Sequence, residues 1–206
     1  PASRSPPSLA LRRRRASFPT GVAMSRPDHL PLPLATLFYG AVAGVAVLGA
    51  AWTSAGVRLL TRAPLARPCP WWVAGLAAGA GLVAATRLAE HLWPALRRLG
   101  SELAKLVGPC HWPRVLALAG LSGLAEEALF RGPVQDFAGL WLTAALFAGL
   151  HGGGRRELWS WTVFALVAGV VFGALAQVYA SPWPAAVAHV LVNALNLRQL
   201  RHYQRE

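Results

Sequence analysis

The chain has 206 residues, of which 55% are hydrophobic and 14% charged, and its 20 lysines and arginines against 8 acidic residues give a formal net charge of +12. The basic residues gather at the ends of apolar runs rather than in one patch, which is typical of membrane-helix flanks and argues against a nucleic-acid partner. This composition excludes an ordinary soluble domain and predicts an all-α, polytopic membrane helix bundle surrounded by lipid.

The N-terminal segment 1–30 is polar, rich in proline and contains four consecutive arginines at 12–15. Such a segment cannot bury enough apolar surface to fold, so residues 1–30 are expected to form a disordered leader. Met24 is the one methionine of the chain. We therefore expect translation to start at Met24.

Two membrane spans are predicted within residues 31–112, at about 34–52 and 71–89. Tryptophans at the start of the second span are typical of a membrane interface. The small residues of that span, Gly75 and Gly79 among them, are expected to permit close approach of another helix rather than to bind a ligand.

The connector that follows, 90–112, repeats leucine every three or four residues against charged side chains. This pattern predicts an interfacial amphipathic helix that lies on the membrane surface. Pro94 and Gly100 argue against one continuous helix through the connector.

A core at 113–199 is predicted to hold four more spans, followed by a basic tail at 200–206. The third span begins near Pro113 and is expected to end around Gly132 and Pro133, because proline removes a backbone donor. The remaining spans are predicted at about 137–151, 158–180 and 185–197. Six spans place both termini on the side that collects most of the arginines, which predicts cytoplasmic termini in a bacterial inner membrane.

The third span contains the sequence LAEEALFR at 124–131. A charged side chain near the bilayer centre costs roughly 2.5–3.5 kcal/mol on insertion scales, so these charges mark a functional site. Glu127 lies four residues before Arg131, and this spacing predicts an ion pair that holds the shape and charge balance of the site. Glu126 is turned about 100° away, so it has no charge partner in its own helix and is free for chemistry.

Two later spans carry further pairs at the same spacing, Phe147 with His151 and His189 with Asn193. The chain thus contains E-E-x-x-x-R, F-x-x-x-H and H-x-x-x-N, in this order and inside predicted spans. Over about residues 116–197 it resembles the CPBP family of glutamate intramembrane endopeptidases, which includes the CAAX prenyl proteases and the bacteriocin-processing and self-immunity (Abi) proteins.

The residue types permit hydrolysis of a peptide bond without a covalent intermediate, because a partly buried carboxylate can serve as a base and side-chain donors can stabilise an oxyanion. The resemblance implies the same division of roles in an endopeptidase that cuts a membrane-associated peptide or protein. By motif position, it implies that Glu126 and His151 activate water, and that His189 and Asn193 stabilise the tetrahedral intermediate.

Three alternatives stay open on the sequence. No cofactor is expected, but Glu126, His151 and His189 are the candidate ligands if zinc is used, even though no H-E-x-x-H motif is present. A non-catalytic immunity or scaffold protein that binds a bacteriocin-type peptide is the main alternative function. A membrane haem protein with His151 and His189 as axial ligands is disfavoured, since paired carboxylates have no role there.

The predicted spans place two of the candidate residues at different depths. Glu126 lies well inside the third span, whereas His151 ends the fourth. Since residues of one site must meet, we expect the third span to start later and the fourth to continue past the glycines at 152–154.

Overall fold

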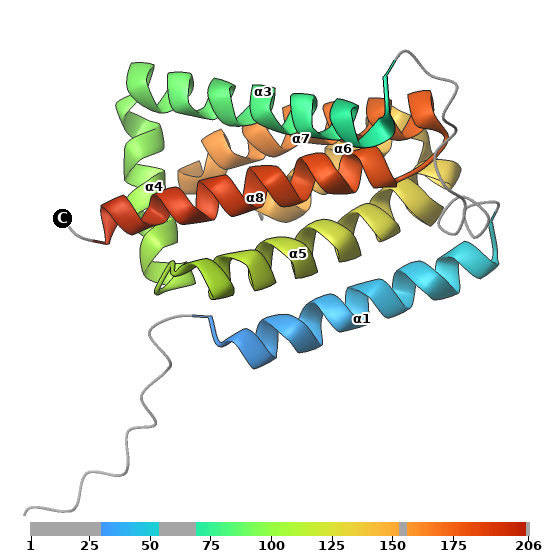
Figure 1. Cartoon of the computed structure of the whole chain (residues 1–206), viewed down its shortest axis with the longest axis horizontal. Coiled ribbons are helices and arrows are strands. Elements are labelled where there is room, and N and C mark those ends of the chain that lie inside the picture. The colour runs from blue at the N-terminus through green and yellow to red at the C-terminus, as the bar shows by residue number, and fades with distance from the viewer. Residues whose placement is uncertain (1–29, 54–68, 153–155, 205–206) are drawn as a thin grey trace, which may run out of the picture.

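The computed structural model describes residues 30–53, 69–152 and 156–204, and these contain helices and no strand (Figure 1). The leader expected at 1–30 lies outside the described residues, except for Leu30. The long helices are α1 Leu32–Ala51, α3 Trp71–Leu92, α4 Pro94–Val107, α5 Trp112–Leu129, α6 Gln135–Gly152, α7 Trp159–Tyr179 and α8 Trp183–Tyr203. A π-helical turn, η1 Phe130–Val134, joins α5 to α6, and a short 3-10 helix, η2 Arg156–Leu158, precedes α7.

Large apolar side chains cover much of the outer surface of the bundle. On α1, for example, Leu37, Phe38 and Leu48 are 72%, 60% and 68% exposed. A surface helix of a soluble protein would turn a polar face outward. Helices α1, α3 and α7 are also long and apolar enough to cross a membrane. The predicted all-α membrane helix bundle is therefore confirmed.

Helix α8 is the centre of the bundle and packs against α3, α5 and α7. In Figure 1 it runs between α3 and α5. Glycines allow this close packing: a Cβ atom on Gly75 would lie 2.5 Å from the Pro184 carbonyl oxygen, and one on Gly79 would lie 2.9 Å from that of Ala188. The prediction that these glycines serve helix packing is confirmed.

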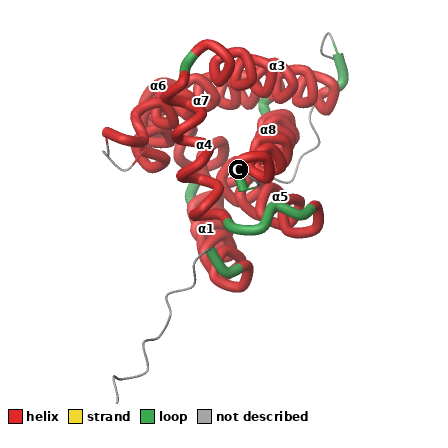
Figure 2. The backbone as a smooth tube through the Cα atoms, turned by 90° about the vertical axis from the view of Figure 1, so that its left-hand side faces the viewer, coloured by secondary structure: helices red, strands yellow, loops and turns green. Residues whose placement is uncertain are grey.

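The amphipathic connector forms α4, which crosses one end of the bundle nearly at right angles to the other helices (Figures 1 and 2). Pro94 is its first residue, a position where the missing N–H is harmless. Helix α3 ends at Leu92, which is three residues beyond the predicted end of its span. Gly100 does not interrupt α4, and the ring of Tyr203 from α8 packs against it.

The predicted helix end near Gly132 and Pro133 agrees with the structure, because α5 ends at Leu129 and the backbone is non-helical at Gly132 (φ −83°, ψ −116°). The chain bends a second time at Gly139 (φ 72°, ψ 176°). Gly139 lies almost midway in the sequence between Glu126 and His151. A change of chain direction near Gly139 therefore brings both residues to the same depth in the bundle.

The expected later start of the third span is wrong, because α5 begins at Trp112, one residue before the predicted start. Helix α6 is described to Gly152, and the expected continuation past the glycines falls on residues 153–155, which lie outside the described residues. Glu126 and His151 reach the same depth through the connection between the two helices, where η1 and the first residues of α6 extend the hairpin. At the far end of the chain, α8 continues to Tyr203, so most of the expected basic tail is helical.

Candidate active site

Glu126 of α5 and His151 of α6 face each other across the hairpin. The distance from Glu126 Oε2 to His151 Nε2 is 3.6 Å. His151 Nδ1 lies 2.8 Å from the carbonyl oxygen of Phe147. Since a carbonyl can only accept, Nδ1 carries the proton and Nε2 of the neutral ring is an acceptor. Two acceptors therefore face one point, an arrangement that can hold a water molecule by accepting both of its hydrogens.

Both side chains keep some contact with the surroundings. The Glu126 side chain is 13% exposed and that of His151 is 21% exposed. The Oε2 atom of Glu126 has no hydrogen-bond donor among the described residues. A buried carboxylate oxygen without a donor is costly, which is typical of a position that receives a water or a substrate group.

Glu127, the next residue, is sealed inside the bundle. Its Oε2 accepts a hydrogen bond from Arg131 Nε at 2.7 Å, and its Oε1 accepts one from His189 Nδ1 at 2.8 Å. The side chains of Glu127 and Arg131 are 0% exposed, and that of His189 is 4% exposed. The predicted Glu127–Arg131 pair is present. Its connection to a histidine of the third motif was not predicted.

The buried network continues from Arg131 to α7. Arg131 Nη1 donates to Gln135 Oε1 at 3.2 Å, and Gln135 Nε2 donates to the carbonyl oxygen of Gly173 at 3.0 Å. A side chain at position 173 would collide with Leu140 and Gln135. The chain of bonds thus fixes the π-helical turn against α7 and sets the position of Glu127.

Asn193 lies one turn after His189 on α8, and its amide is held by α5. Its Nδ2 donates to Ser122 Oγ at 2.8 Å, and Ser122 Oγ donates to the carbonyl oxygen of Leu118 at 2.8 Å. Ser122 lies one turn before Glu126. The structure therefore brings all four predicted catalytic side chains to the packed region between α5, α6 and α8.

Aromatic rings separate and orient the two histidines. The His189 ring stacks on Phe172, with centroids 5.0 Å apart and planes 20° apart. Phe147 lies between the histidines, with its ring centroid 4.2 Å from that of His151 and 5.8 Å from that of His189. The rings limit rotation of both imidazoles, so Phe147 acts as a packing residue between them.

The sequence motifs miss several residues of this region. Tyr39 of α1 places its hydroxyl next to Glu126 and Ser122, and Gln135 completes the Arg131 network. The available signal for Tyr39 was its position as a polar aromatic side chain inside an apolar span. Helix α1 lies outside the three motifs, so nothing in the sequence connected it with them.

The zinc alternative needs Glu126, His151 and His189 as ligands. Each histidine would offer Nε2, since its Nδ1 atom is bonded to a carbonyl or to the Glu127 carboxylate, as is usual for a metal-bound histidine. Within the described segments, however, no three acidic, histidine or cysteine side chains are grouped so as to hold a metal ion.

Comparison with known proteins identifies the region that contains the three motifs. Residues 109–195 match the family described as type II CAAX prenyl endopeptidase Rce1-like. The uncharacterized protein YpbD of Bacillus subtilis (strain 168) is 33% identical over 98 residues, which cover 46% of this chain and 50% of YpbD. The chain thus spans about half the length of the curated relative that it matches. No solved structure gives a significant match.

Proposed function

Because residues 109–195 belong to the Rce1-like family of type II CAAX prenyl endopeptidases, we propose that the protein is an intramembrane endopeptidase that hydrolyses a peptide bond in a membrane-associated substrate. The match confirms the family resemblance of the three motifs. The observation that carries the proposal is the pair of acceptors 3.6 Å apart, Glu126 Oε2 and His151 Nε2. A pair of this kind is suited to holding and deprotonating one water molecule.

In the proposed first step, the water oxygen attacks the carbonyl carbon of the scissile bond. Glu126 takes the proton that the water loses, and His151 orients the water through its second hydrogen. The carbonyl π electrons move to its oxygen and form an oxyanion. In the second step the oxyanion collapses, the C–N bond breaks, and Glu126 returns the proton to the leaving nitrogen. The products are a carboxylic acid and an amine, which ionise to a carboxylate and an ammonium group.

The proposed oxyanion donors come from α8. The Asn193 amide has a second N–H besides the one that bonds Ser122. His189 can donate from Nε2 in the form that carries protons on both ring nitrogens, with Nδ1 held by the Glu127 carboxylate. Donors fixed in advance stabilise developing charge without reorganisation, and one such donor contributes on the order of 10²–10³ in rate.

The sealed pair of Glu127 and Arg131 has a separate role in the proposal. Its charges cancel within the bundle, so Glu127 can hold His189 without placing an unpaired charge in lipid. Glu127 is therefore a positioning residue. We assign the mechanism to the glutamate type, with no metal ligand role for Glu126.

We also propose that α1, α3, α5, α6, α7 and α8 all cross the membrane, with both termini cytoplasmic in a bacterial inner membrane. The start of α1 and the end of α8 lie at the end of the bundle that α4 crosses (Figure 1). Basic side chains collect there, which supports this orientation by the positive-inside rule. They are Arg87, Arg97, Arg98, Lys105, Arg114, Arg198 and Arg201.

The identity of the substrate is tested by comparing the lengths of membrane-associated peptides and proteins in cells that carry the wild type and in cells that carry Glu126→Ala. The proposal expects a membrane-associated peptide or protein that is longer in the variant. A farnesylated peptide and its non-prenylated counterpart, given to the purified protein, then decide whether a prenyl group is required. If Glu126→Gln leaves the cellular phenotype intact in a correctly inserted protein, peptide binding without catalysis replaces the protease proposal.

A further inference from the structure

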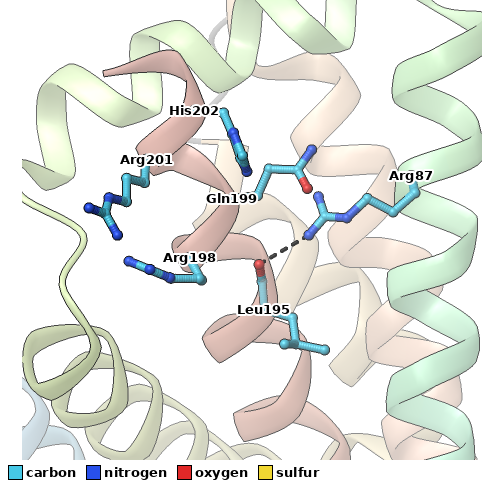
Figure 3. A pocket seen from close by; sticks show the side chains of 6 residues that line it. All are labelled: Arg87, Leu195, Arg198, Gln199, Arg201 and His202. Carbon is cyan, nitrogen blue, oxygen red and sulfur yellow. Dashed lines mark hydrogen bonds between the residues drawn. The ribbon is translucent and has the colours of Figure 1, made fainter. Parts of the chain in front are cut away.

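A polar cavity of about 290 Å³ lies at the end of the bundle that α4 crosses, and none of the proposed catalytic residues lines it (Figure 3). One side is a face of α8, since its residues recur at spacings of three and four. The other side comes from α3. The lining residues are Arg87, Leu195, Arg198, Gln199, Arg201 and His202.

Arginines from two helices line this cavity. Arg87 reaches from α3 and donates from Nη2 to the carbonyl oxygen of Leu195 at 3.0 Å. Figure 3 shows Arg198 and Arg201 extending together from the side of α8 that is turned away from Arg87. Arg198 Nη1 donates to the carbonyl oxygen of Cys110 at 2.7 Å.

The positive charge of the cavity is not neutralised by the protein. The acid beside it, Glu90, lies 3.4 Å from Arg87 Nη1 and accepts a second hydrogen bond from Gln199 at 2.6 Å. Among the described residues, no carboxylate lies within ion-pair distance of Arg198 or Arg201. Three guanidinium groups thus line the cavity with one carboxylate beside it, and the excess positive charge attracts an anion.

The position of the cavity relative to the membrane indicates which anions lie close to it. Helix α4, which is amphipathic, crosses the same end of the bundle (Figure 2), as a helix lying in the membrane interface does. Trp112 lies under Arg198, with 5.0 Å from the guanidinium carbon to the ring centroid. Tryptophan at a helix start is typical of the headgroup level. The phosphate groups of lipids lie at that level.

We propose that this cavity binds the phosphate group of an anionic membrane phospholipid. Basic pockets between membrane helices bind anionic headgroups, and the planar guanidinium group matches the geometry of phosphate oxygens. Most of the lining belongs to α8, which also carries His189 and Asn193. The proposal does not depend on peptidase activity.

The test uses the purified full-length protein in nanodiscs. Thermal melting is compared between discs of phosphatidylcholine alone and discs that also contain phosphatidylglycerol. Phosphatidylglycerol is expected to raise the melting temperature of the wild type, and Arg201→Gln is expected to lose at least half of that increase. Arg201→Lys should keep more of it than Arg201→Gln. Arg98→Gln is the matched control, since it removes one exposed charge of α4 outside the cavity and should keep the full increase.

Three results would overturn the proposal. Equal melting temperatures in the two kinds of disc would show that the headgroup charge has no effect. An equal loss in Arg98→Gln and Arg201→Gln would indicate general surface attraction. If inorganic phosphate in phosphatidylcholine discs gives the whole increase, the cavity takes free phosphate rather than lipid. Should Arg201→Gln fail to fold, retention of one phosphatidylglycerol by the wild type in native mass spectrometry decides the question, and no retention overturns it.

Discussion

Glu126 and Glu127 are consecutive on α5, yet Glu126 keeps 13% of its side chain exposed and Glu127 keeps none. Adjacent residues of a helix point about 100° apart. One carboxylate therefore faces His151 across the hairpin, while the other is enclosed by Arg131 and His189. The helix geometry separates a carboxylate that water can reach from one that holds the structure.

Removing Arg131 should destabilise the fold. Arg131→Ala leaves the Glu127 carboxylate without its main partner at a fully buried position. Loss of one member of a buried pair reduces the free energy of unfolding by roughly 3–5 kcal/mol. We expect less monodisperse protein in detergent and a lower melting temperature than for the wild type.

The double change Glu127→Gln with Arg131→Gln should recover part of that loss, because no charge is then left unpaired. Recovery will be incomplete, since His189 and Gln135 also lose bonding partners. Arg98→Ala on α4 serves as a control for removal of one arginine. A double variant that melts below Arg131→Ala would contradict the assigned structural role.

Gly139 should be sensitive to substitution because of its backbone conformation. Its φ of 72° with ψ of 176° is a conformation that side chains avoid, and Gly139→Ala is expected to cost ~1–3 kcal/mol in backbone strain. No atom lies within 4 Å of a Cβ built at Gly139 or at Gly149 of α6. Gly149→Ala should thus be neutral or stabilising. Equal melting temperatures for the two variants would show that the chain does not bend at Gly139.

The close contact of α3 with α8 predicts a second contrast between glycines. Even an alanine at position 75 would press its Cβ against the backbone oxygen of Pro184, so Gly75→Ala must move the helices apart. Gly81 on the same helix has open space at its Cβ position. We expect Gly75→Ala to lower the melting temperature and Gly81→Ala to leave it unchanged or higher. The packing described for α3 and α8 fails if Gly75→Ala is as stable as Gly81→Ala.

The sequence predicts the membrane bundle and the Glu127–Arg131 pair because both follow from local spacing. Apolar runs set the helices, and residues four apart share a face whatever the rest of the chain does. The amphipathic α4 follows from the same argument. The break at Pro94 was predicted because proline acts locally.

The depth of the site could not be predicted in this way. Gly132 and Pro133 carry the local signals of a helix end, and the helix breaks there, but the second bend at Gly139 lies inside a predicted span and was not anticipated. The bond between Glu127 and His189 joins residues 62 positions apart, so no local pattern contains it. Tyr39 reaches the site through the packing of α1 on α5, which is equally non-local.

Metal removal tests the proposed glutamate mechanism. Incubation of the purified protein with EDTA, followed by assay on a quenched farnesylated peptide, is expected to leave the rate unchanged. The reason is that Glu126 and the two histidines do not form a grouped ligand set in the described part of the chain. Loss of cleavage with EDTA and its return on adding zinc would favour the metal alternative.

The central claim is that Glu126 is the catalytic base and not a structural residue. The decisive measurement pairs the cleavage rate of Glu126→Gln with its thermal melt, beside those of the wild type and Arg131→Ala. General base catalysis contributes on the order of 10²–10⁴-fold, so Glu126→Gln should lose at least that much turnover while melting like the wild type. If Glu126→Gln retains turnover, or melts far below Arg131→Ala, Glu126 is not the catalytic base and the account is contradicted.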